Sequence, residues 1–327
     1  MASGLKGIHH VSAMTAKALR NYEFYTQVMG MRLVKKTVNQ DDTSMYHLFY
    51  GDDKGSPGTE LTFFELPIMG RNRPGSASIS AYSLRVASDE ALSWWERRFD
   101  ELGVDHDGLL ERAGRMTLAF RDPEEQRVLL VSDEHNAGVA AGNPWSGGPV
   151  PVEYGITGLG PVQLTVRNAA PTLATLTDLL GFRRKGAYPS HMPGQPDVVI
   201  MEVGEGGSGA EVHVEERNDL ERERLGRGGV HHVAFRVEDE HELREWVQRI
   251  SEAGYGNSGY VDRFYFRSLY FREPGGILIE LATDGPGFDT DEEQDRLGET
   301  LSLPPFLEPN REAIEARLKP LVTELAR

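Results

Sequence analysis

The chain has 327 residues, no cysteine and a formal net charge of -16. The lack of cysteine excludes disulfides, thiolate zinc sites and cysteine nucleophiles, so His, Asp or Glu must bind any metal. The acidic balance argues against nucleic acid and anionic membranes as partners, because both are bound by basic surfaces. The sequence has no run of about 18 apolar residues that could form a transmembrane helix. Residues 1–13 hold no apolar signal core, so we expect a cytoplasmic protein.

The sequence predicts four repeated units, and in each unit one strand and one helix are followed by about three more strands. For the first unit we predict a strand at 8–14, a helix at 16–30 and strands at 31–38, 45–51 and 59–66. For the second unit we predict a strand at 78–86, a helix at 90–103 and strands at 115–122 and 127–133.

For the third unit we predict a strand at 160–168, a helix at 170–181 and strands at 182–188, 197–204 and 210–216. For the fourth unit we predict a strand at 229–237, a helix at 242–254 and strands at 268–274 and 276–283. The four predicted helices end in glycine, which suits a left-handed C-terminal cap, at Gly30, Gly103, Gly181 and Gly254.

The organisation of the chain follows from these units. Residues 135–155 are rich in Gly and Pro and predict a linker between the second and third units. We therefore expect an α+β protein with one domain at 1–134 and another at 156–284, each built from two βαβββ units. Residues 285–327 are predicted to form a C-terminal helical extension, because 310–318 has an amphipathic helical pattern.

Several stretches carry a resemblance to a known family: HHVSAMTAKALRNYEFYTQVMGMRLVKKTV, YHLFYGDDKGSPGTELTFFE, GGVHHVAFRV, RFYFRSLYFREPGGILIELATDGPGF and FLEPNREAIEARL. With the four βαβββ units, the chain resembles the vicinal oxygen chelate superfamily of glyoxalases, bleomycin-resistance proteins and extradiol ring-cleaving dioxygenases. It is most similar to the ring-cleaving branch that includes the hydroquinone 1,2-dioxygenases. The resemblance implies two cupped sheets, Fe(II), and a dihydroxylated aromatic and O2 as substrates.

Two histidine doublets occupy equivalent first strands, His9-His10 in the first unit and His231-His232 in the fourth. Successive side chains of a strand point to opposite faces, so one histidine of each doublet should face the concave side of the sheet. In the fourth unit His231 shares its face with Val233 and is predicted to face the apolar core. His10 and His232 are therefore the predicted metal ligands. A lone strand histidine is usually structural, but the repetition of the doublet argues against that alternative.

Glu280 lies in the apolar strand GGILIELAT. A buried carboxylate is costly without a partner, so its position favours a bound cation; the alternative is an edge strand with a solvated face. His10, His232 and Glu280 form a 2-His-1-carboxylate set, which suits Fe(II) oxygen chemistry but could also hold Mn(II), Zn(II) or Ni(II). The resemblance favours Fe(II).

The other units lack these ligands. An alignment of SLRV on AFRV places Ala81 opposite His232, and an alignment of the Pro-Gly turns places Phe63 opposite Glu280. We therefore predict that no fourth protein ligand exists and that one chain holds one metal. Because the ligands come from the first and fourth units, those units should share one sheet and the second and third units the other.

The resemblance also assigns residues around the metal. It implies active-site roles for Arg263 and Tyr270, and for His9 and His231 the roles of supporting a ligand or exchanging a proton. Arg263 could hold a second ring oxygen, and Tyr270 could donate to a phenolate. The structural alternatives are a surface cation beside Asp262 and a packed strand aromatic.

Two other functions remain open at the sequence level. One is a glyoxalase-like metal-dependent isomerase or lyase, and the other is a non-enzymatic small-molecule binding protein of the resistance type. The sequence leaves open whether the substrate is a hydroquinone or a catechol. It is compatible with a homo-oligomer but does not decide the oligomeric state.

Overall fold

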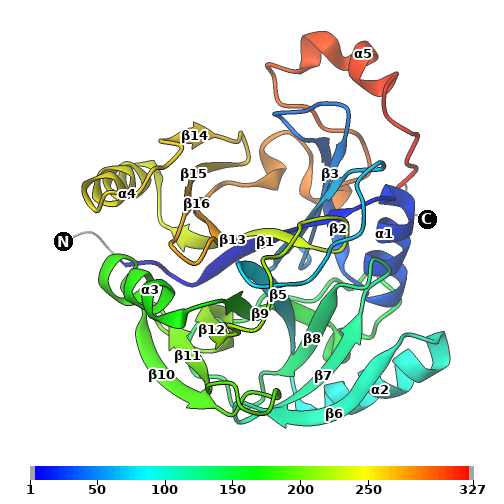
Figure 1. Ribbon diagram of the computed structural model, residues 1–327. Coiled ribbons are helices and arrows are strands. Elements are labelled where there is room, and N and C mark those ends of the chain that lie inside the picture. The colour runs from blue at the N-terminus through cyan, green and yellow to red at the C-terminus, as the bar shows by residue number, and fades with distance from the viewer. Residues whose placement is uncertain (1–3, 324–327) are drawn as a thin grey trace.

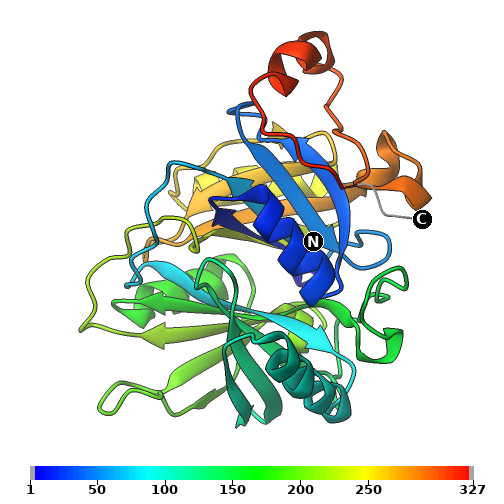
Figure 2. The same cartoon turned by 90° about the vertical axis from the view of Figure 1, so that its right-hand side faces the viewer.

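The computed structural model describes residues 4–323, whose strands form two eight-stranded sheets. The sheets make up the two halves of the molecule in Figures 1 and 2. The first sheet runs in the order β14 (Val261–Asp262), β15 (Phe266–Arg272), β16 (Leu278–Pro286), β13 (Val230–Val237), β1 (Ile8–Thr15), β4 (Glu60–Glu65), β3 (Tyr46–Gly51), β2 (Arg32–Val38). The second runs in the order β10 (Arg183–Tyr188), β11 (Val198–Glu202), β12 (Glu211–Glu216), β9 (Ile156–Val166), β5 (Ser78–Val86), β8 (Arg127–Ser132), β7 (Arg115–Arg121), β6 (His106–Arg112).

Each sheet joins two units through their first strands. β1 and β13 pair antiparallel in the middle of the first sheet, and β5 and β9 do so in the second. The predicted sharing of one sheet by the first and fourth units is therefore confirmed. Each sheet contains one unit from each side of the linker. The division of the chain into domains 1–134 and 156–284 therefore does not coincide with the two sheets, and it stays a prediction.

The helices are α1 (Ala18–Glu23), α2 (Asp89–Leu102), α3 (Ala169–Ala174), α4 (Glu240–Glu252) and α5 (Arg311–Glu315). α1 and α3 each continue as a π-helical turn, Phe24–Val28 and Thr175–Leu179. α2 and α4 lie against their sheets through the buried side chains of Trp95 and Trp246. All four predicted helix-ending glycines have positive φ values, between 66° and 85°. Among the described residues, no helix is both long and apolar enough to span a membrane.

The C-terminal extension packs along the outer strand β2, and Figure 1 shows it in orange and red beside β3. The backbone N–H of Ser302 donates to the Lys36 carbonyl at 2.9 Å, and the Tyr46 hydroxyl donates to the Lys319 carbonyl at 2.9 Å. Short 3-10 turns complete the structure at Val152–Tyr154, Ser208–Ala210, Phe288–Thr290, Gln294–Arg296 and Glu308–Asn310.

Alternation of side chains divides the first sheet into a core face and a cavity face. In β13, Val233 and Phe235 belong to the main hydrophobic core, whereas Ala234 belongs to a separate cluster on the opposite face. The strands that carry the predicted ligands, β1, β13 and β16, are direct neighbours. This adjacency allows side chains more than two hundred residues apart in sequence to meet.

Candidate metal centre

Both histidine doublets lie at β-bulges. Ile8 pairs with Phe235 and His10 with Ala234, so His9 is an extra residue in β1. Ser12 pairs with His232 while the next residue pairs with Val230, so β13 has an extra residue too, His231. A bulge changes the direction of the side chain at the extra residue, and bulges are frequent next to active sites. The side chain of the first histidine in each doublet therefore need not point to the face that strict alternation predicts.

The three predicted ligands meet at one point. The Nε2 atoms of His10 and His232 lie 3.1 Å apart. The Oε2 atom of Glu280 lies 3.0 Å from the former and 2.8 Å from the latter. All three residues are at most 3% exposed. Ligands bound at about 2.0–2.2 Å around one metal lie roughly 3 Å from one another, so this convergence fits a single ion.

The charges of the three residues also suit a cation. Burial by itself raises the pKa of Glu280, but the charges and hydrogen bonds of His10 and His232 outweigh burial and hold the pKa well below its usual value. Burial lowers the pKa of His232 and keeps its imidazole neutral, although Glu280 opposes this shift. The Ser268 hydroxyl donates to Glu280 Oε1 at 2.6 Å, which directs Oε2 towards the histidines.

His9 supports the ligand His10 from behind. Its Nε2 atom donates to the Thr283 carbonyl at 3.0 Å, and its Nδ1 atom lies 3.0 Å from His10 Nδ1. Burial, reinforced by His10, lowers the pKa of His9 to about 3. A neutral imidazole carries one N–H, so His9 Nδ1 accepts and His10 Nδ1 donates. This bond leaves His10 Nε2 free to bind the ion.

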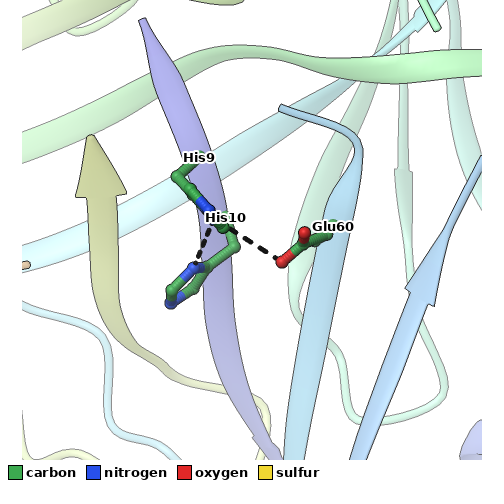
Figure 3. A group of neighbouring side chains, drawn as sticks. All are labelled: His9, His10 and Glu60. Carbon is green, nitrogen blue, oxygen red and sulfur yellow. Dashed lines mark hydrogen bonds and ion pairs between the residues drawn. The ribbon is translucent and has the colours of Figure 1, made fainter. Parts of the chain in front are cut away.

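Glu60 stands beside His9 in a second cluster with His10, which Figure 3 shows. Its Oε2 atom lies 3.5 Å from His9 Nδ1 and has no hydrogen-bond partner within residues 4–323. Burial, with Asp52 and other acids nearby, raises the pKa of Glu60 well above its usual value. Because the Nδ1 atom of His9 already accepts a hydrogen bond from His10 Nδ1, we interpret the cluster as a support for His10.

His231 differs from His9 in its surroundings. Its Nδ1 atom lies 2.7 Å from His232 Nδ1, which matches the pair in the other doublet. However, His231 lines the cavity above the metal site, whereas His9 lines a separate cavity of about 180 Å³ together with Glu60. The alternation rule predicted that both first histidines face away from the cavity. That prediction is wrong for His231, whose bulge frees it from alternation and whose neighbours leave it open to the cavity.

A cavity of about 310 Å³ opens over the three ligands, and its size lies within the range for small-molecule sites. Its apolar walls come from Met14, Val38, Met45, Phe49, Phe64, Leu66, Phe266 and Leu278. Its polar lining includes the three ligands and Ser12, Asn39, Gln40, Asp41, His47, His231, Arg263 and Tyr270. The cavity can therefore surround an aromatic ring and still contact oxygen substituents.

Arg263 and Tyr270 both line this cavity, as the predicted active-site roles require. Arg263 Nε donates to the Tyr270 hydroxyl at 3.3 Å, and its Nη2 atom donates to Asp41 Oδ2 at 2.9 Å. Tyr270 pairs with Glu280 across β15 and β16. Burial raises the pKa of Tyr270, which keeps its hydroxyl protonated as a hydrogen-bond donor.

One alignment made from the sequence is off by a residue. Glu280 pairs with Ala234, two residues beyond His232, and Thr62 pairs with Ser12, two residues beyond His10. Thr62, rather than Phe63, therefore takes the place of Glu280 in the first unit. The turn before β4 is one residue shorter than the turn before β16, and an alignment on the prolines hides this difference.

Sequence reasoning also missed His47, which lines the cavity from β3. A signal was present, because Tyr46, Leu48 and Tyr50 alternate as buried core residues and leave His47 on the opposite face. Asp41 was missed as the partner of Arg263, since it lies in the loop between β2 and β3.

The matches to known proteins agree with this geometry. Residues 7–130 and 158–281 each match the model of the glyoxalase/bleomycin resistance protein/dioxygenase superfamily. The chain belongs to this superfamily. Within it, the chain is 55% identical over 317 residues to MhqA of Bacillus subtilis strain 168, provisionally named a ring-cleaving dioxygenase. That match covers 97% of this chain and 99% of MhqA.

Two further proteins match over nearly their whole length. The chlorohydroquinone/hydroquinone 1,2-dioxygenase of Sphingobium indicum is 29% identical over 314 residues, 93% of each chain. A Bacillus subtilis crystal structure, provisionally described as a dioxygenase, superposes with a TM-score of 0.88 at 34% identity, covering 99% of this chain and 100% of that one. The predicted fold and the predicted enzyme class, a ring-cleaving dioxygenase, are confirmed. Membership and the His–His–Glu cluster together support a metal-dependent enzyme.

Proposed function

We propose that the protein is an Fe(II)-dependent, extradiol-type ring-cleaving dioxygenase that acts on hydroquinone or a substituted hydroquinone. The observation that carries the proposal is the convergence of His10, His232 and Glu280 beneath a cavity with aromatic walls. In support, the Sphingobium indicum relative is named for hydroquinone and chlorohydroquinone. Catechol is the second candidate substrate, and the predicted cytoplasmic location is part of the proposal.

His10, His232 and Glu280 would hold the ion. If Fe(II) were held there, it would supply open coordination positions for the proposed oxygen chemistry and would make that reaction effectively intramolecular. In the net reaction a ring carbon–carbon bond breaks and both oxygen atoms enter the opened product. The balance therefore needs no other oxidant or reductant.

The chain's own residues bind and orient the substrate in this proposal. The Tyr270 hydroxyl, held by Arg263, donates a hydrogen bond towards charge that develops on an oxygen near Glu280. His231 is the candidate to exchange a proton with the substrate. Of the two first histidines, His9 and His231, it is the one that lines the cavity. His9 keeps a supporting role behind His10. The apolar walls exclude water from the ring.

The test is metal replacement followed by measurement of oxygen uptake. The purified protein is stripped of metal and reloaded without oxygen with Fe(II), Mn(II), Zn(II) or Ni(II). Hydroquinone, chlorohydroquinone, catechol and a hemithioacetal are then offered to each form. We expect oxygen uptake with Fe(II) and the hydroquinones. Absence of uptake with every diol, or isomerisation of the hemithioacetal by the Zn(II) or Ni(II) form, contradicts the proposal.

A further inference from the structure

His47 stands on the cavity wall in β3, on the first-unit side of the metal site. Its ring lies between those of Phe49 and Phe64, with centroid distances of 4.0 and 4.1 Å. Burial, reinforced by His10 and His232, lowers the pKa of His47 well below its usual value, so the ring is neutral. A neutral ring clamped between two aromatic rings is a fixed polar group in an otherwise apolar wall.

Among the described residues, His47 uses one of its two ring nitrogens. Its Nε2 atom lies 3.0 Å from Thr62 Oγ1, which lies 2.7 Å from Ser12 Oγ. The Nδ1 atom has no hydrogen-bond partner within the described residues, and the side chain is partly accessible. In a neutral imidazole the second nitrogen is either a donor or an acceptor. A phenolic hydroxyl can do either as well, so both tautomers of His47 can bind one.

The position of His47 relative to the ligands suits a para arrangement of oxygens. The ring centroid of Phe64 lies 4.1 Å from that of His47 and 6.5 Å from that of His232. His47 and the predicted ligand His232 line the same cavity, so one substrate ring bound there can reach both. In a para-dihydroxylated ring the two oxygens lie on opposite edges, whereas in an ortho-dihydroxylated ring they are adjacent.

We propose that His47 binds the substrate oxygen that does not bind the metal, and that it thereby selects para-dihydroxylated over ortho-dihydroxylated rings. The proposal rests on the metal site and diol substrate of the proposed function. Arg263, which contacts Tyr270, is a cation and suits an ionised oxygen or an acidic substituent. The neutral His47 suits an un-ionised hydroxyl.

Equilibrium binding to the Fe(II)-loaded protein in the absence of oxygen tests this assignment. Titration calorimetry is run with hydroquinone, catechol and phenol on the wild type, His47→Phe and His47→Gln. Phenylalanine keeps the ring and removes both nitrogens, whereas glutamine keeps hydrogen-bonding groups. Phenol lacks the second oxygen, and the second oxygen of catechol lies on the wrong edge of the ring. Metal content and melting temperature are measured on each protein.

We expect His47→Phe to weaken hydroquinone binding by roughly 10-fold to 100-fold, the effect of losing one buried hydrogen bond. Binding of phenol and catechol should change by less than about 2-fold, and His47→Gln should recover part of the lost affinity. Equal weakening for all three ligands, or no weakening for hydroquinone, overturns the assignment. Failure of the wild type to consume oxygen contradicts the proposed function instead, because binding is measured without turnover.

Discussion

Thr62 occupies in strand β4 the place that Glu280 occupies in strand β16. Thr62 pairs with Ser12 and Glu280 pairs with Ala234, and each partner lies two residues beyond a cavity-facing histidine. A carboxylate at position 62 would give the metal a fourth protein ligand. With threonine there, a metal held at the proposed site would have three protein ligands and more open positions, as the proposed oxygen chemistry at Fe(II) requires.

Thr62→Glu should therefore convert the site towards four protein ligands. The buried glutamate destabilises the metal-free protein, and bound metal should restore its melting temperature. We expect slower loss of Fe(II) to a chelator and at least about a 10-fold fall in oxygen uptake, because an open position is filled. Thr62→Val, which keeps the volume, should retain metal like the wild type. If Thr62→Glu lost metal and consumed oxygen at the wild-type rates, position 62 would not be equivalent to position 280.

Glu280→Gln should cost metal binding while the protein stays folded. Glutamine keeps the size of Glu280 but removes the negative charge shared by two histidines. We expect iron per chain, measured by elemental analysis after gel filtration, to fall by at least about 10-fold relative to the wild type. Glu215→Gln is the matched control, since Glu215 is a buried strand carboxylate in the second sheet. Unchanged occupancy in Glu280→Gln would refute the ligand assignment.

Asp41 should matter for turnover through Arg263. Asp41 is largely exposed and its ion pair contributes little to stability. It nevertheless fixes the guanidinium that contacts Tyr270. We expect Asp41→Asn to lower kcat/KM by about 3-fold to 10-fold, with an unchanged melting temperature. Asp42→Asn, which affects only contacts to Ser44, should leave kcat/KM unchanged. Identical kinetics for the two variants would show that Asp41 does not position Arg263.

The stability of the protein should depend on Asp122 between pH 4 and pH 6. Burial raises the pKa of Asp122 from 3.8 to about 6, against hydrogen bonds from Tyr25 and two backbone N–H groups. The folded state therefore binds the proton more tightly than the unfolded state, and stability falls as the pH rises through this window. Above pH 6 the buried charge lowers the free energy of unfolding by about 3 kcal/mol, relative to a carboxyl whose pKa stays at 3.8.

Asp122→Asn removes this ionisation and keeps an acceptor for the two N–H groups. We expect the variant to exceed the wild type in free energy of unfolding by up to about 3 kcal/mol at pH 7, and the difference to shrink towards pH 4. Urea unfolding at several pH values measures it. Asp219→Asn, in an exposed carboxylate paired with Arg217, should show no such gain. A pH-independent difference would mean that Asp122 is already ionised without cost.

The sheet pairing could be predicted from the sequence because ligands of one metal must meet. His10, His232 and Glu280 lie in the first and fourth units, which forced these units into one sheet, and β1 and β13 do pair. Strand β6 (His106–Arg112) was missed because HDGLLER has no fully buried residue and shows no clean apolar alternation. Position 62 was missed because register between distant strands depends on turn length, which proline positions do not report.

The directions of the side chains of His9 and His231 could not be predicted from the sequence. The prediction from alternation assumes regular pairing of the strands, and nothing in GIHHVSAM or GGVHHVAF indicates a β-bulge. In the structure the two bulges fall on His9 and His231, and the two residues then differ because one meets Glu60 and the other meets the open cavity. Such differences come from tertiary neighbours rather than from local sequence.

Incorporation of labelled dioxygen tests the central claim most directly. The Fe(II)-loaded protein is given hydroquinone under 18O2, and the product is analysed by mass spectrometry. We expect a ring-opened product that carries both atoms of one dioxygen molecule, with none formed by Glu280→Gln. A product with one labelled atom or none, or oxidation of hydroquinone to its quinone alone, would contradict it.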